Sequence, residues 1–201
     1  MNLRKLCNEK GFLYFATTLL TKSDLLVSSA LYKFDVDDNE LNKWFELYDS
    51  LINDKAKILK LEKKSSYYKS FILIYIFYLT QVDNNKIIII QNNRDFSKEL
   101  TSLIKNFLEL DGVEGSKPII DLLNRIEFSN KSTLNFLKLG TYNIKNLDNI
   151  DFIYFGEGKV INTEKLIFDL NEIDFLGAKK VKKTILSIDN DLNLNYIKKI
   201  K

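Results

Sequence analysis

Three short polar segments in this chain each follow an apolar run that we interpret as a buried β-strand. The first, Lys63–Ser70, reads KKSSYYKS; the second, Gly156–Gly158, reads GEG; the third, Ser187–Asp191, reads SIDND. In parallel α/β sheets, ligands bind beyond the carboxyl ends of the strands. These three segments are therefore the places where a site is expected, provided that their strands belong to one sheet.

The segment Lys63–Ser70 has part of the pattern of a phosphate-binding loop. Such a loop has the spacing G-x-x-x-x-G-K-[ST], and Lys69 and Ser70 match its last two positions. Lys63 and Tyr68 stand where the two glycines belong. Those glycines let the backbone curl so that its N–H groups face phosphate. The alternative interpretation is an ordinary Lys-Ser pair in a solvated loop.

The other two segments match the remaining parts of a nucleoside triphosphatase site less completely. Such an enzyme ends its metal-binding strand with Asp-Glu, where Asp holds Mg²⁺ through water and Glu polarises the attacking water. Here the pair is Gly156-Glu157, and the alternative is a tight Gly-x-Gly turn. The third segment offers Ser187, Asp189 and Asn190 at a strand end, and its alternative is a capped turn.

Composition excludes several kinds of catalytic site. The chain has 201 residues and no histidine, which removes Ser-His-Asp and Cys-His catalysis and most zinc sites. Cys7 is its one cysteine and cannot form a disulfide within the chain, so we expect a reducing, cytoplasmic setting. The net charge of +3 is too small to indicate a nucleic-acid partner by itself.

Neither apolar region of the chain has the pattern of a membrane segment. The run Phe71–Leu79 is shorter than the ~20 apolar residues that a spanning helix needs, and polar residues follow it directly. Near the N-terminus, Asn8–Lys10 interrupts the apolar pattern too early for a secretory signal. We therefore expect no membrane association.

Hydrophobic periodicity predicts alternating strands and helices. We expect helices over Asn2–Leu20, from Ser23 to Phe34, over Asp38–Leu51, after Asp95 and from Asn162; short strands at Ile58–Leu61, Ile87–Ile90, Phe152–Phe155 and Thr184–Ile188; and a hairpin around the turn Ser129–Lys131. The stretch Ser70–Gln81 fits a buried helix or a strand. This alternation predicts an α/β fold with a largely parallel sheet flanked by helices. We expect one domain over residues 1–201, with a helical lead-in over 1–52 and an α/β core over 53–201.

The order of these segments resembles the ATPase domain of the large terminase subunit of tailed phages, the motor that packages viral DNA. The resemblance runs from about residue 35 to the end. Residues 41–79 resemble the family's lead-in helix, first strand, Walker A loop and following helix, and residues 85–110 resemble its next strand and helix. The hairpin RIEFSNKSTLNFLKLG resembles the family's hairpin. The segment NIKNLDNIDFIYFGEGKVI stands at the Walker B position, and KKTILSIDND stands at the coupling motif. The same P-loop core occurs in helicases, and the hairpin and the motif spacing favour terminase.

The resemblance implies a P-loop NTPase-like fold with an inserted β-hairpin and a site for ATP and Mg²⁺. Lys69 would bind the β- and γ-phosphates, Ser70 would ligate Mg²⁺, Glu157 would be the catalytic carboxylate, and Ser187 would lie in the coupling segment. The implied partners are double-stranded DNA, the small terminase subunit and the portal.

The departures from the family pattern predict weak or absent ATP hydrolysis. Lys63 and Tyr68 replace the loop glycines, and we expect the Tyr68 ring to crowd the phosphate cradle. Gly156 replaces the metal-binding Asp, and Asp189 stands near the place of Thr-Pro. The family's nuclease domain is missing, so we expect either a fragment of a longer gene or a stand-alone remnant.

Two other interpretations remain open. In one, the protein is a non-enzymatic binding module that keeps the fold and contacts nucleic acid or a packaging protein, since lysines and aromatics together can bind nucleic acid. The residues concerned are Lys55, Lys57, Lys60, Lys63, Lys64, Lys69, Tyr67 and Tyr68. In the other, the chain is an unrelated α/β protein that binds no nucleotide.

Overall fold

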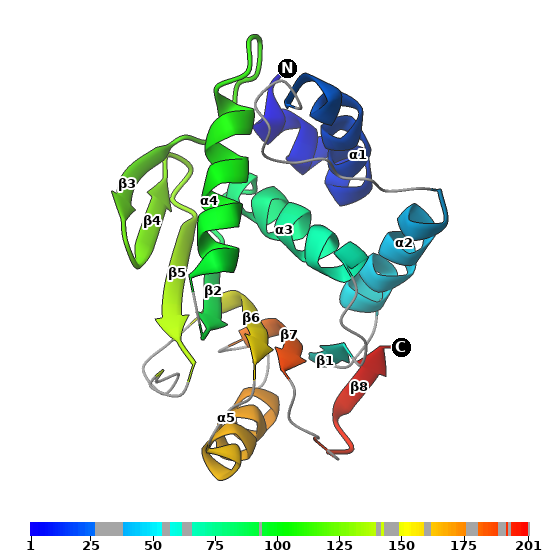
Figure 1. Ribbon diagram of the computed structural model, residues 1–201, viewed down its shortest axis with the longest axis vertical. Coiled ribbons are helices and arrows are strands. Elements are labelled where there is room, and N and C mark those ends of the chain that lie inside the picture. The colour runs from blue at the N-terminus through cyan, green and yellow to red at the C-terminus, as the bar shows by residue number, and fades with distance from the viewer. Residues whose placement is uncertain are drawn as a thin grey trace.

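One mixed β-sheet of eight strands forms the centre of the molecule (Figure 1). The computed structural model describes residues 1–26, 38–53, 57–61, 66–92, 94–139, 142, 149–158, 162–175, 181–188, 192 and 194–200. The strands are β1 (Ile58–Leu61), β2 (Lys86–Gln91), β3 (Pro118–Leu122), β4 (Arg125–Phe128), β5 (Thr133–Lys138), β6 (Ile150–Gly158), β7 (Val181–Ile188) and β8 (Ile197–Ile200). The helices are α1 (Leu3–Leu26), α2 (Asp38–Asn53), α3 (Ser66–Gln81), α4 (Asp95–Leu108) and α5 (Thr163–Phe175).

The sheet is parallel except at one side. Its strand order is β3-β4-β5-β2-β6-β7-β1-β8. Every pair from β5 to β8 in this order is parallel, whereas β4 runs antiparallel to β5 and β3 runs antiparallel to β4. The predicted α/β class with a largely parallel sheet is therefore confirmed, as is the predicted hairpin, which is β4–β5.

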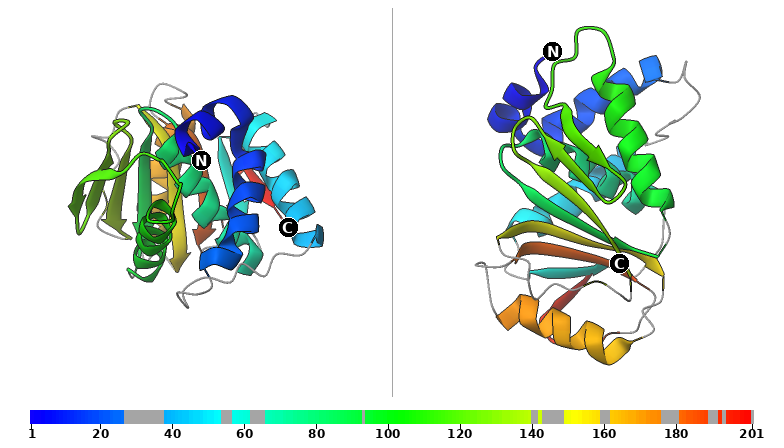
Figure 2. Two further views of the ribbon diagram at one scale, coloured as in Figure 1. Left: turned by 90° about the horizontal axis from the view of Figure 1, so that it is seen from above. Right: turned by 90° about the vertical axis from the view of Figure 1, so that its left-hand side faces the viewer.

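Helices cover both faces of the sheet. Helices α1 to α4 lie on one side of it, and α5 lies on the other (Figures 1 and 2). The four isoleucines of β2 show the same division, because side chains alternate along a strand. Ile87 and Ile89 belong to the core under α1 to α4, and Ile88 and Ile90 belong to the core under α5.

The stretch whose periodicity left helix and strand open is helix α3. Residues Phe71–Phe77 are all buried, because α3 packs between the sheet on one side and α1 and α2 on the other. Phe71 meets Phe12 of α1 edge-on at 5.4 Å, and Tyr75 meets Phe152 of β6 at 5.3 Å. A helix buried all round is apolar all round. Across the described residues, no helix is long and apolar enough to span a membrane.

Several boundaries differ from the sequence expectation. Helix α1 continues to Leu26 and carries a kink at Gly11, whose φ is 76°. The helix expected from Ser23 to Phe34 extends into residues 27–37, which lie outside the described residues. Strands β3 and β8 were not expected.

A polar network closes the amino edge of the sheet. Asn130 Nδ2 donates to the carbonyl oxygens of Thr80 (3.0 Å) and Val82 (3.1 Å), and Asn130 Oδ1 accepts from the Ser132 N–H (3.1 Å). Ser132 Oγ donates to the Val82 carbonyl (2.6 Å) and accepts from the Asn85 N–H (3.1 Å). These bonds join the end of α3 to the turn that precedes β5, and so fix the start of two neighbouring strands.

Candidate functional site

The strands that lead into the three polar segments are neighbours. In the sheet order, β7 lies between β6 and β1, and both pairings are parallel. Their carboxyl ends therefore meet at one edge of the sheet, which is where ligands of parallel α/β proteins bind. Glu157 and Ser187 lie at this edge, near the ends of β6 and β7, and Lys69 lies in α3, the helix that follows β1.

Gly156, Glu157 and Ser187 come together at an irregularity between β6 and β7. Phe155 pairs with Leu186 and Gly158 pairs with Ile188, so Gly156 and Glu157 together oppose Ser187. Ser187 is 8% exposed. An extra residue of this kind re-aims side chains and is frequent beside active sites. The alternative interpretation of residues 156–158 as a tight turn is wrong, because β6 continues through Gly158.

Position 156 has room for a side chain. A Cβ added to Gly156 would lie 3.4 Å from the Ile90 carbonyl oxygen, 3.5 Å from Gln91 Cβ and 3.6 Å from Tyr154 Cε1. These are ordinary van der Waals distances. A Cβ therefore fits at this buried position without displacing a neighbouring atom.

Lys69 lies in the first turn of α3 and pairs with a carboxylate of α4. Its Nζ is 2.5 Å from Glu99 Oε2, and the two side chains are 42% and 24% exposed. Both helices begin at the carboxyl edge, α3 after β1 and α4 after β2. The ammonium group is thus at the expected edge, with Glu99 as its partner.

The loop between β1 and α3 is shorter than a phosphate-binding loop requires. Helix α3 begins at Ser66, so Tyr68 is a helical residue and does not belong to the loop. Its side chain is 5% exposed and joins the core between the sheet and α1 to α4. The expectation that this ring crowds a phosphate cradle is therefore wrong. Ser70, the next residue after Lys69, is partly buried in the same helix.

The residues present fit a magnesium ion poorly. Among the described side chains, no three acidic, histidine or cysteine residues converge on one point. The position of the family's metal-binding Asp is Gly156, and Ser70 alone is a weak ligand set for Mg²⁺, which prefers carboxylates together with water and phosphate oxygens. The side chain of Glu157, together with Lys63, Asp189 and Asn190, lies outside the described residues.

The lysines and tyrosines that could bind nucleic acid do not form one exposed surface within the described residues. Lys60 and Tyr68 are buried, and Lys69 is paired with Glu99. Lys57 is partly buried at the start of β1. Lys55, Lys63, Lys64 and the side chain of Tyr67 lie outside the described residues.

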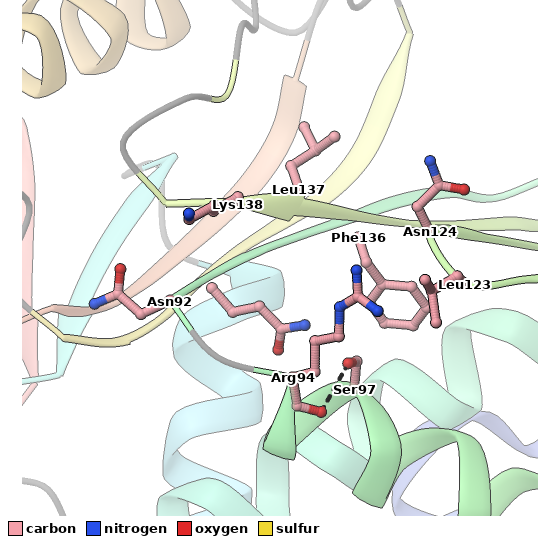
Figure 3. A pocket seen from close by; sticks show the side chains of 9 residues that line it. Asn92, Arg94, Ser97, Leu123, Asn124, Phe136, Leu137 and Lys138 are labelled. Atoms are coloured by element: carbon pink, nitrogen blue, oxygen red, sulfur yellow. Dashed lines mark hydrogen bonds between the residues drawn. The ribbon is translucent and has the colours of Figure 1, made fainter.

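A cavity that the sequence did not indicate lies at the same edge of the sheet, at the ends of β2 and β5. It has a volume of about 350 Å³ and is formed by the ends of β2 and β5, the start of α4, and the turn between β3 and β4. Figure 3 shows Arg94 extending from the start of α4 toward the strand that carries Phe136 and Lys138. A hollow of about 550 Å³ along α4 shares Arg94, Ser97, Leu123 and Phe136 with it. Arg94 and its neighbours follow the IIII run directly in sequence, but no motif marks them.

Neither protein-family models nor curated proteins yield a match to this chain. The candidate site therefore rests on its own geometry.

Proposed function

We propose that this chain is a P-loop NTPase-like domain of the kind found in the large terminase subunit, and that it binds ATP weakly and hydrolyses it little or not at all. The observation that carries the proposal is the strand order β6-β7-β1. It brings the strands that precede the three polar segments to one edge of the sheet, although about 85 residues separate the first segment from the second and about 30 separate the second from the third. Phosphoryl transfer depends on such convergence, because it is catalysed by positioning and charge.

Two features support weak binding. Lys69 is already paired with Glu99 at 2.5 Å, so a phosphate must displace a carboxylate. Helical backbone occupies residues 66–68, where a phosphate-binding loop would present its N–H groups. One feature supports poor hydrolysis, namely Gly156 in place of the metal-binding carboxylate. The packaging role, with double-stranded DNA, the small terminase subunit and the portal as partners, is supported by the sequence resemblance.

ATP titration in the presence of Mg²⁺, followed by calorimetry, tests the binding half of this proposal. We expect weak binding by the wild type, about tenfold weaker binding by Lys69→Ala because a charge-assisted contact is lost, and tighter binding by Glu99→Gln. Lys10→Ala, which removes an exposed charge from α1, is the control and should bind as the wild type does. Equal affinity of the wild type and Lys69→Ala would contradict the assignment of Lys69.

A steady-state ATPase assay tests the catalytic half. We expect wild-type turnover to equal that of Glu157→Gln within error. Turnover well above that variant would show that the carboxylate works without the missing Asp, and the proposed loss of hydrolysis would be wrong.

A further inference from the structure

The cavity between β2, β5 and α4 contains a buried polar atom that the protein leaves unsatisfied. Gln91 is 6% exposed and lines the cavity, and its Oε1 has no hydrogen-bond partner. An orphaned buried acceptor destabilises the folded protein relative to a satisfied one. Ser97, which is also buried at this cavity, is satisfied, because its Oγ donates to the Arg94 carbonyl at 2.9 Å (Figure 3). Gln91 is thus poised to accept a hydrogen bond from a ligand.

The charge around this cavity is positive. Arg94 and Lys138 line it, and Lys138 lies directly beside Gln91 in the β2–β5 register. Among the described residues, no carboxylate lines this cavity. In the adjoining hollow, Asp121 is already paired with Lys105 at 2.5 Å. The cavity therefore favours a ligand with an anionic group.

An aromatic wall completes the lining. Phe136 of β5 is partly buried and borders both the cavity and the adjoining hollow. Aromatic rings provide stacking surfaces for nucleobases of any sequence. A volume of about 350 Å³ lies within the range of small-molecule sites.

We propose that this cavity binds a nucleotide, with an N–H of the base donating to Gln91 Oε1, the base lying against Phe136, and the phosphate facing Arg94 and Lys138. The nucleotide is either a free mononucleotide or one residue of a single-stranded nucleic acid that continues along α4. This site is separate from Lys69 and does not depend on the ATP site proposed above.

Binding measurements on the full chain test this inference with two probes. Calorimetry with AMP reports the free nucleotide, and fluorescence anisotropy with a labelled mixed-sequence single-stranded DNA reports the polymer. We expect Gln91→Leu and Arg94→Ala each to weaken binding about tenfold. Lys10→Ala is the charge-matched control and should bind as the wild type does, and Lys69→Ala reports any contribution of the other site. Binding of AMP alone identifies a mononucleotide site, and binding of the DNA identifies a strand site.

The melting temperature of Gln91→Leu separates a ligand site from a merely structural role. Because this variant removes an orphaned acceptor, it should melt at or above the wild-type temperature while losing affinity. The inference is wrong if neither probe binds the wild type at millimolar concentration, or if Gln91→Leu and Arg94→Ala keep full affinity. Loss of binding in Lys69→Ala alone would also overturn it, since the nucleotide would then occupy the other site.

Discussion

The ion pair between Lys69 and Glu99 would weaken the proposed contact of Lys69 with phosphate only modestly. Glu99 is about one-quarter exposed, and Lys69 itself is nearly half exposed. Ion pairs at this exposure contribute about 0–1 kcal/mol, so the pair lowers the affinity for a phosphate by no more than about fivefold. Glu99 is therefore a modest competitor, which a polyphosphate with several negative charges can displace.

Gly156→Asp should introduce a carboxylate at the position where the proposed function would require a metal-binding Asp. Because a Cβ at this position meets only ordinary contacts, we expect the variant to fold, but with a lower melting temperature than the wild type, since position 156 is buried and burying a carboxylate costs free energy. We also expect its ATP affinity to become dependent on Mg²⁺, which calorimetry with and without the ion measures.

Gly156→Ala is the matched control for that variant. It shares the backbone effect of losing glycine, worth about 0.5–1 kcal/mol, but it adds no ligand. If Asp and Ala at position 156 gave the same response to Mg²⁺, the metal position inferred from the strand pattern would be wrong.

At the scale of elements, the amino-edge network holds α3 against the start of β2 and β5. Asn130→Ala removes two donated bonds and one accepted bond at a buried site. It leaves the Thr80 carbonyl without this donor. We expect a loss of about 2–4 kcal/mol in the free energy of unfolding, measured by urea denaturation.

Asn106→Ala on α4 is the control for Asn130→Ala. Asn106 makes one long side-chain bond to Ser102 at 3.4 Å, and alanine favours helix. Its stability should change by less than about 0.5 kcal/mol. Equal effects of the two variants would show that the network contributes nothing beyond the loss of an asparagine.

How well each element could be predicted depended on what surrounds it. The Ile87–Ile90 strand was predictable because burial on both faces produces a continuous apolar run. The type of α3 was not, because a helix enclosed between sheet and helices loses the period that separates its two faces. Strand β8 reads IKKI at the edge of the sheet; these four residues are too few to recognise as a strand and lack the alternation that marks one.

The candidate site was predictable only as a set of strand ends. The parallel sheet brought Glu157 and Ser187 to adjacent strands, as expected for neighbouring strands of an α/β fold. The pairing of Lys69 with Glu99 and the cavity around Gln91 depend on the packing of α3 and α4 on the sheet. Spacing along the chain carries no information about contacts of that kind.

At the scale of the molecule, alkaline pH should destabilise the fold through the layer that α1 and α3 share. Burial raises the pKa of Cys7 from 9.0 to about 12 and that of Tyr78 from 10.0 to about 12, and it also raises the pKa of Tyr75. The unfolded chain then loses these protons at lower pH than the folded one, so stability falls as pH rises from about 9 towards 12.

Urea denaturation followed by the fluorescence of the buried Trp44 measures this decline. Cys7→Ala removes the group that titrates first, and its stability should fall less steeply between pH 9 and 10. Stability that is constant across this range in the wild type would contradict burial of the thiol and the two phenols.

The position of β1 has a consequence for the order in which the chain can assemble. Its neighbours in the sheet are β7 and β8, so β1 pairs with two strands that are synthesised long after it. Until residues 181–200 have been made, β1 lacks these two neighbours, and α3 lacks part of the sheet that covers it. Contacts this distant in sequence make folding slow, and they leave an apolar helix exposed during synthesis. Burial of β1 between its two neighbours thus depends on the synthesis of β7 and β8.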